Sequence, residues 1–325
     1  MKGLVPIAAA VALLAAAPLV TQSNVVLNFL VMTFLIALAG QGWNLLGGYG
    51  GQYSFGHAAF FGTGAYVTAI AQMHYGINAW VGFFIGVAAG ALVGAVIGLL
   101  SFRSGLRGSY FALVTLAFAE VFRIIASVTP ITGAGVGTLI KLDLRPEAFQ
   151  FQSRVPFYWI ALGLVAVSLI IVRIIEDSRF GAHLVAVREN EDAASALGVN
   201  PTMVKLAAMT VSAAITAAAG CFYAQYFLFI DASIAYGPWV SIEALLAPIV
   251  GGVGTVFGPL LGALVVRTLG EVTKLMTGDA PGLDLVIYGS VLVVVVAFAP
   301  RGIAGVITML RQGFAARPIP ERGHD

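Results

Sequence analysis

Long apolar stretches recur along almost the whole chain and are separated by short polar segments. A helix needs roughly 20 predominantly apolar residues to cross a hydrocarbon layer of about 30 Å, and most of the stretches approach that length. The pattern predicts an all-α integral membrane protein, a polytopic bundle of about ten transmembrane helices within a range of about eight to ten. The predicted spans are residues 4–20, 25–46, 54–73, 79–102, 109–128, 157–175, 206–230, 239–253, 256–275 and 283–299.

Two of these stretches have a second interpretation. Residues 4–20 also fit a secretory signal peptide, with Lys2 as its charged start and a small-residue site near Pro18. We predict a retained helix there. Residues 239–253 are short for a full crossing and contain Pro248, so they are either a complete span or a broken, re-entrant helix.

The composition agrees with a lipid environment. Charged residues make up 10% of the chain, whereas soluble domains carry about 25%. The net charge of +2 provides no basic field for nucleic acid, so we predict lipid and no nucleic acid as a partner. The single cysteine, Cys221, excludes an intrachain disulfide, and the four histidines lack the spacing of a metal site, so no metal is predicted.

The basic residues predict the orientation of the spans, because cytoplasmic loops of membrane proteins are enriched in lysine and arginine. With ten spans, one side receives Lys2, Arg103, Arg107, Arg173, Arg179, Arg188, Lys205, Arg301, Arg311, Arg317 and Arg322. The other side receives Lys141, Arg145 and Arg154, with Lys274 near a helix end. The first side is therefore predicted to be cytoplasmic, together with both termini.

This orientation defines the domain organisation. A transmembrane domain is predicted over residues 1–310, with an external loop at 129–156 and a cytoplasmic loop at 176–205. Residues 311–325 contain Pro318 and Pro320 and are predicted to be a flexible cytoplasmic tail.

One predicted span carries a stripe of small residues. Its glycines recur at every fourth position and therefore share one helix face: Gly82, Gly86, Gly90, Gly94 and Gly98. In lipid, helices associate largely through close backbone approach at small residues. The stripe predicts helix packing rather than a binding site.

A glycine cluster at 47–51 predicts a break between the second and third spans. Broken helices with exposed backbone form midplane sites in transporters, but for the glycines themselves a simple cytoplasmic turn between two helices is slightly favoured. The polar residues near the break and one carboxylate give a candidate translocation path: Gln41, Asn44, Gln52, Ser54, His57 and Glu243. Gln41 and Asn44 could instead bond between helices.

Glu243 is included because it has no charged partner on its own helix. Glu120 and Glu271 do have one, Arg123 at i+3 and Arg267 at i−4, which favours a structural role for those carboxylates. The chain has no GxxxxGK[ST] phosphate loop, so it cannot bind ATP in that manner. We predict that it is not an enzyme.

The cytoplasmic loop holds an amphipathic helical pattern with both acidic and basic residues on its polar face. An anionic leaflet would repel the acids, so docking into a soluble partner is favoured over lying in the membrane interface. The candidate coupling residues are Arg188, Glu189, Glu191, Asp192, Ala193, Ala194, Leu197 and Gly198.

The run from Asp192 to Gly198 resembles the EAA motif of ABC importer permeases, with aspartate in place of glutamate. Four blocks in the same order resemble the branched-chain amino-acid permease family of the LivM type. They are residues 47–66 (GGYGGQYSFGHAAFFGTGAY), 107–120 (RGSYFALVTLAFAE), 188–200 (RENEDAASALGVN) followed by Lys205-Leu206, and 251–263 (GGVGTVFGPLLGA).

The resemblance implies a permease subunit of an ATP-driven importer in the bacterial inner membrane. Its expected partners are a sister permease of the LivH type, two cytoplasmic ATP-binding subunits that dock on residues 188–198 and bind ATP and Mg, and a periplasmic substrate-binding protein at residues 129–156 and 231–238. No cofactor is expected in this chain. The expected substrate is leucine, isoleucine or valine. Relatives that move urea, short amides or aromatic acids leave alternatives open, and a stand-alone secondary transporter is the competing class.

Overall fold

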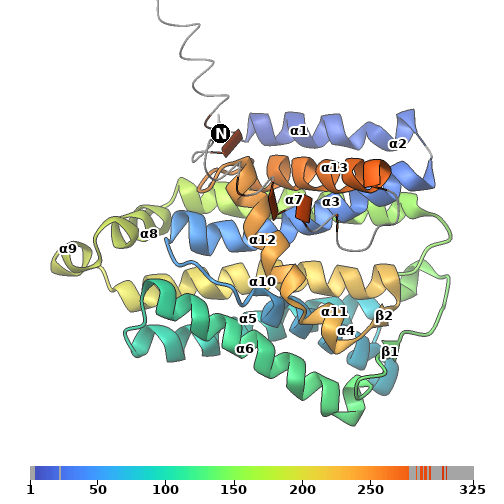
Figure 1. Cartoon of the computed structure of the whole chain (residues 1–325), viewed down its shortest axis with the longest axis horizontal. Helices are drawn as coiled ribbons and strands as arrows, with labels where there is room; N and C mark the ends of the chain where they lie inside the picture. Colours follow the sequence, from blue (N-terminus) through green and yellow to red (C-terminus); the bar gives the residue numbers. More distant parts are fainter. Residues whose placement is uncertain are drawn as a thin grey trace, which may run out of the picture.

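The computed structural model describes residues 4–21 and 23–277, together with the single positions 283, 286, 287, 289, 290, 293, 302, 303 and 305. The predicted tail at 311–325 lies outside the described residues, as does the predicted tenth span at 283–299 apart from some of these single positions. The described part is almost entirely helical (Figure 1). Its exceptions are loops, two 3-10 turns and one short pair of antiparallel strands.

The elements follow one another along the chain with short connections. The helices are α1 Val5–Ala15, α2 Ala17–Val20, α3 Asn24–Trp43, α4 His57–Tyr75, α5 Ala79–Arg103, α6 Gly108–Val128, α7 Arg154–Glu176, α8 Arg179–Glu189, α9 Glu191–Ala196, α10 Pro201–Phe227, α11 Ala232–Ala235, α12 Pro238–Gly251 and α13 Gly258–Thr277. A π-helical turn, η1 Asn44–Tyr49, extends α3. The 3-10 turns are Pro130–Thr132 and Pro146–Ala148, and the strands are β1 Thr138–Leu139 and β2 Phe229–Ile230.

Six helical segments among the described residues are long and apolar enough to cross a membrane. They are Asn24–Tyr49, Ala79–Arg103, Gly108–Val128, Arg154–Glu176, Pro201–Phe227 and Ala232–Gly251. The first apolar stretch is shorter, at Val5–Val20. This confirms an all-helical, multi-pass membrane protein, whereas the larger number of spans stays a prediction.

The third and ninth predicted spans are helical, as α4 and α13, but they are less apolar than the six. The first two thirds of α4 are almost wholly buried against other helices, so its polar residues face protein rather than lipid. The eighth predicted span, 239–253, corresponds to α12, which continues through Pro248. The chain is interrupted just before that span, where Tyr236 and Gly237 separate the single turn α11 from α12.

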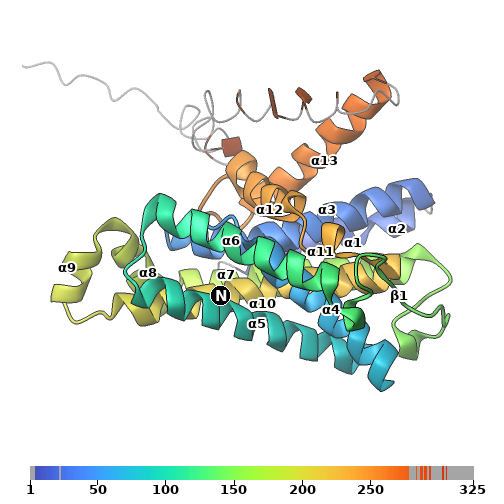
Figure 2. The same cartoon turned by 60° about the horizontal axis from the view of Figure 1, so that its bottom comes forward.

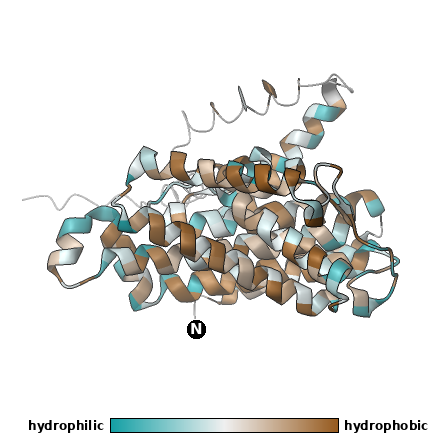
Figure 3. Ribbon diagram, turned by 90° about the horizontal axis from the view of Figure 1, so that it is seen from below, coloured by the Kyte–Doolittle hydropathy of each residue, from teal (hydrophilic) through white to brown (hydrophobic). Residues whose placement is uncertain are grey.

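Polar residues lie at the two ends of the bundle and apolar residues between them (Figure 3). The loop that holds α8 and α9 is at one end, and the long loop between α6 and α7 is at the opposite end (Figure 1). The two loops predicted to face the cytoplasm and the exterior are therefore separated by the length of the helices.

The long loop at 129–153 packs against the bundle. Thr138 and Leu139 pair with Ile230 and Phe229 in an antiparallel ladder, and Ile140 N donates to Leu228 O at 2.8 Å. Phe149 is buried and stacks on Trp80 with ring centroids 4.1 Å apart. This loop is thus joined to the segment that follows α10.

Helix α10 is the central helix of the bundle and packs against α3, α4 and α5 (Figure 2). The α5 glycines make the closest approaches: a Cβ on Gly90 would collide with Cβ of Ala217, and one on Gly94 with Cβ of Ala213. Gly86 lies equally close to Thr68 of α4 and Cys221 of α10. At the stripe's ends, Gly98 faces Met209 and Leu206 of α10, and Gly82 faces Thr68 and Ala71 of α4.

Replacing Gly90 with alanine should therefore destabilise the bundle by about 1–3 kcal/mol, because the added methyl group forces α5 away from α10. Thermal unfolding of the detergent-solubilised protein measures the effect as a lower melting temperature. Gly163→Ala on α7 is the matched control, because a Cβ there meets no atom within 4 Å. Equal melting temperatures for the two variants would contradict the packing role of the stripe.

Candidate functional site

The chain between α3 and α4 does not form a simple turn at the end of the bundle. After η1 ends at Tyr49, residues 50–56 are not helical, and Gly51 has a φ of +65°. α4 begins at His57, whose Nε2 lies 3.0 Å from Oγ of Ser212. Ser212 is eleven residues beyond Pro201, the start of α10, or about 17 Å along the helix. Residues 50–56 therefore carry the chain from one end of the bundle into its interior, as in transporters with broken helices.

A second broken segment meets this one from the opposite end of the bundle. After β2, the short helix α11 places Tyr236 against α4, where the ring stacks on Tyr66 at 5.7 Å between centroids. Gly62 of α4 leaves the space that the Tyr236 ring fills. α12 then starts at Pro238, and its Ser241 Oγ accepts a hydrogen bond of 2.9 Å from Ala58 N at the start of α4. The first turns of α4 and α12 are thus joined inside the bundle.

A small cavity lies where these two segments meet α6. Its volume is about 20 Å³, which is close to the size of one water molecule. It is lined by Phe55, Ala58, Leu116, Ala119, Glu120, Tyr236, Pro238 and Ser241. We call it the junction cavity. It is closed to anything as large as an amino acid in this conformation.

Glu120 at the edge of the junction cavity forms a double hydrogen bond with Arg123. The distances are 2.8 Å from Nε to Oε2 and 2.5 Å from Nη2 to Oε1. Both side chains are partly exposed, 49% for Glu120 and 32% for Arg123, and they lie in the second half of an apolar span. Charged groups at that depth are costly against lipid. This face of α6 therefore turns toward water or toward another protein chain.

The predicted path residues fall into three places. Gln52, Ser54 and His57 lie in or beside the non-helical segment. There, Ser54 O accepts a hydrogen bond of 2.8 Å from Trp43 Nε1, and Gln52 Nε2 donates one of 3.2 Å to Gly50 O. Their hydrogen bonds shape the segment that presents Phe55, and none of the three lines the junction cavity.

Gln41 and Asn44 hold a different loop. Gln41 Nε2 donates to Val256 O at 2.8 Å. Asn44 Nδ2 donates a hydrogen bond of 2.9 Å to Thr255 O, and Asn44 Oδ1 accepts one of 2.8 Å from Gly254 N. The two side chains thus join the end of α3 to the connection between α12 and α13, which is the interhelical use that the sequence left open.

Glu243 does not reach the junction cavity. It follows Ser241 by two residues, which places it nearly on the opposite face of α12. There it lies in the electrostatic field of Arg267 and Lys274 of α13. The prediction that Glu243 lacked a partner considered only its own helix, and its cationic neighbours come from the next one.

The sequence also assigned Glu120 a structural role because of its partner at i+3. The fold shows the expected pair with Arg123 and also places Glu120 in the lining of the junction cavity. Two features of the sequence could have indicated this site. Glu120 ends the block at 107–120 that resembles the permease family, and Gly237-Pro238 interrupts an apolar run as the glycines at 47–51 do. Tyr236, Pro238 and Ser241 were missed because their approach to α4 depends on the tertiary fold.

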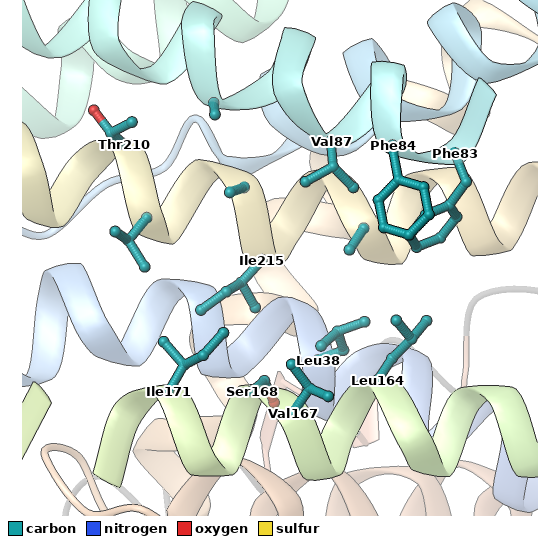
Figure 4. A pocket seen from close by; sticks show the side chains of 14 residues that line it. Leu38, Phe83, Phe84, Val87, Leu164, Val167, Ser168, Ile171, Thr210 and Ile215 are labelled. Carbon is teal, nitrogen blue, oxygen red and sulfur yellow. The ribbon is translucent and has the colours of Figure 1, made fainter. Parts of the chain in front are cut away.

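Another cavity in the bundle is of a different kind. It measures about 320 Å³ and lies between α5 and α7 over α10, lined by apolar side chains such as Phe84, Val167 and Ile215 (Figure 4). Its two hydroxyls are already bonded within their own helices, Ser168 to Val165 O and Thr210 to Leu206 O. It therefore offers no free polar group to an ionic solute, and its chemistry suits hydrocarbon.

The predicted coupling segment is not one helix, which corrects the sequence interpretation. Asn190 is extended, with φ −156° and ψ 105°, and its side chain accepts 2.9 Å from Ala193 N as the N-cap of α9. An asparagine can bond its own backbone locally, so it ends α8 and starts α9. The predicted residues divide between these two helices and the turn after them.

The coupling residues also face different ways. Arg188 turns back onto the bundle and donates 2.9 Å to Gly48 O and 2.6 Å to its neighbour Glu189, and Ala194 is buried. Glu191 accepts 2.6 Å from Lys205 Nζ. The exposed members of the set are Arg188, Glu189, Asp192, Ala193, Leu197 and Gly198. The Ala193 N–H belongs to the α9 cap, Asp192 lies 3.8 Å from Nη2 of Arg107, and Gly198 has a φ of +89°. Leu197 is 87% exposed.

Among the described residues, no group of three or more His, Cys, Asp or Glu side chains is placed to hold a metal ion.

Comparison with known proteins identifies the family. The chain is 29% identical over 297 residues to the high-affinity branched-chain amino acid transport system permease protein LivM of Salmonella typhimurium, covering 84% of this chain and 68% of that protein. It is 25% identical to the LivH permease of the same organism, covering 83% and 91%. It is also 22% identical to the fructose import permease protein FruF of Bifidobacterium longum, covering 72% and 66%.

No solved structure matches the chain. A family model described as "Branched-chain amino acid transport system / permease component" matches residues 25–296, which include both broken segments and the α8–α9 loop. The chain therefore belongs to the family of permease components of branched-chain amino acid transport systems.

Proposed function

We propose that this chain is the membrane-spanning permease subunit of an ATP-driven importer of branched-chain amino acids in the bacterial inner membrane. The observation that carries the proposal is the partly exposed Glu120–Arg123 pair beside the junction cavity, at membrane depth. A charged face in that position is stable when it lines a path or an interface. A sister permease on this face would complete the path, and two ATP-binding subunits and a periplasmic binding protein would complete the importer.

The lining of the junction cavity supports a zwitterionic substrate. Glu120 in this lining can attract an ammonium group, while Phe55, Leu116 and Pro238 offer apolar surface for an aliphatic side chain. Arg123, the partner of Glu120 just outside the lining, can attract a carboxylate. A sugar has no charge and is bound through several neutral hydrogen-bonding groups; here the neutral ones are the hydroxyls of Tyr236 and Ser241. The balance of charged and apolar groups favours an amino acid over the sugars moved by some relatives.

The importer proposal is tested by uptake into proteoliposomes that contain this chain with its permease, ATP-binding and binding-protein partners. Radiolabelled leucine should accumulate only when ATP is enclosed on the side of the ATP-binding subunits. Fructose and urea serve as competing substrates. Accumulation driven by an ion gradient without ATP would identify a secondary transporter, and uptake of fructose or urea in preference to leucine would correct the substrate.

A further inference from the structure

The bundle-facing side of α8 contacts the beginning of the non-helical segment between η1 and α4. The Arg188 guanidinium donates 2.9 Å to Gly48 O, and its aliphatic carbons lie against Cα of Gly51, where a Cβ would touch them. Leu184, fully buried one turn earlier, faces Gly50 in the same way. α8 therefore holds the chain at the point where it leaves the helix.

The other end of this segment is held at the junction cavity. Phe55 N donates 3.1 Å to Thr115 Oγ1, and Gly56 lies directly against the Thr115 carbonyl of α6. Trp43 Nε1 donates 2.8 Å to Ser54 O. Phe55 itself is 39% exposed and lines the cavity. Residues 51–56, which we call the strap, thus run from Arg188 at one end of the bundle to Phe55 inside it.

The strap is short and contains no helical turn that could absorb movement by unwinding. Its two ends are held by contacts: Arg188 packs on Gly51 at one end, and Thr115 holds Phe55 and Gly56 at the other. A displacement of α8 can therefore reach Phe55 through the strap while both sets of contacts are kept.

We propose that the strap transmits movement of α8 to Phe55, so that nucleotide-driven motion of the ATP-binding subunits changes the shape of the junction cavity through the Arg188 contact. The inference rests on the proposed importer function. It gives Arg188 a role beyond docking, because its guanidinium donates to Gly48 O and its aliphatic carbons lie against Gly51. Leu197, which is 87% exposed, remains the candidate contact for the partner.

The proposed role of Arg188 in transmitting movement can be separated experimentally from a purely structural role. An arginine that bonds a carbonyl at a helix end also stabilises that end, since such carbonyls lack partners within the helix. A structural role predicts lower stability when Arg188 is removed. The strap predicts in addition that the cavity at Phe55 no longer responds to nucleotide.

The experiment uses the complete transporter with Phe55→Cys, and the readout is the rate of modification by a small thiol reagent. The native Cys221 is buried and gives a low background, which Cys221→Ser in the same assembly measures. The rate is compared without nucleotide and with ATP trapped in the ATP-binding subunits. With Arg188 present, we expect the rate to change at least fivefold between the two states.

Two variants then test the strap. Arg188→Ala removes the contact from the α8 side, and Gly51→Ala forces apart the strap and Arg188 at a residue with φ +65°. In both, the fivefold change should disappear and leucine uptake should fall at least tenfold. Arg179→Ala, which removes the same charge from an exposed position at the other end of α8, should leave the change intact.

The outcomes separate the two proposals. If ATP drives leucine uptake and position 55 still responds to nucleotide in both variants, the strap is wrong and the importer stands. If both variants lose the ATP-binding subunits during purification, the contact serves docking and the strap is again overturned. If leucine uptake by the unmodified transporter is independent of ATP, the proposed function itself fails.

Discussion

Replacing Glu120 with glutamine should lower leucine uptake by the complete importer roughly 10- to 100-fold, because a charge-assisted hydrogen bond contributes about 1.5–3 kcal/mol. The variant removes the carboxylate that would meet the substrate ammonium group and leaves Arg123 without its partner. The loss should fall mainly on the leucine concentration needed for half-maximal uptake. Uptake rates measured over a range of leucine concentrations distinguish this from a loss of assembled protein.

The double variant Glu120→Gln, Arg123→Gln separates substrate binding from an interface role. If the pair only holds two permeases together, removing both charges at once relieves the unpaired arginine and should restore uptake. If the pair contacts the substrate, uptake should stay low in the double variant although the permeases copurify. Recovery to the unmodified rate would therefore assign the pair to the interface.

Replacing Leu197 with aspartate should release the ATP-binding subunits and abolish ATP-driven uptake. Leu197 is 87% exposed and is the C-cap of α9. The α8–α9 loop lies at one end of the bundle (Figure 1). Burying a leucine in a partner's groove contributes about 1.5–3 kcal/mol, and a buried, unpaired carboxylate adds a further cost. Copurification of the ATP-binding subunits measures the loss directly.

Leu197→Met is the matched control, because it keeps an apolar side chain of similar size and should retain binding. The alternative for this exposed leucine is insertion into the membrane interface. Two results together would support that alternative. The ATP-binding subunits would stay attached to the Leu197→Asp variant, and in a separate Leu197→Trp variant brominated lipid would quench the tryptophan fluorescence.

The helical architecture could be predicted from the sequence because lipid leaves few options for the backbone. Every buried N–H and C=O must bond within its own segment, so an apolar run of adequate length becomes a helix. The starts of α5 and α6 agree with the predicted spans to within one residue. α4 was also found from its apolar pattern, although its polar residues keep it below the hydropathy of a lipid-exposed span.

The candidate site was less accessible to sequence reasoning, since it depends on which segments meet. The glycines at 47–51 correctly indicated a break, but a break alone does not reveal how deep the chain re-enters. That depth is set by the contact of His57 with Ser212 on α10. Glu120 and Glu243 were assigned opposite roles because only partners on the same helix could be considered.

The pairing of β1 with β2 has a consequence for how the two sides of the membrane communicate. The ladder joins the long loop at 129–153 to the segment that leads through α11 to Tyr236 and Pro238. One wall of the junction cavity is therefore tethered to the surface where a delivering protein would land. Phe55, which also lines the cavity, is connected through residues 51–56 to Arg188 at the opposite end of the bundle. In the proposed importer, substrate delivery on one side and ATP hydrolysis on the other would therefore both act on the lining of this cavity.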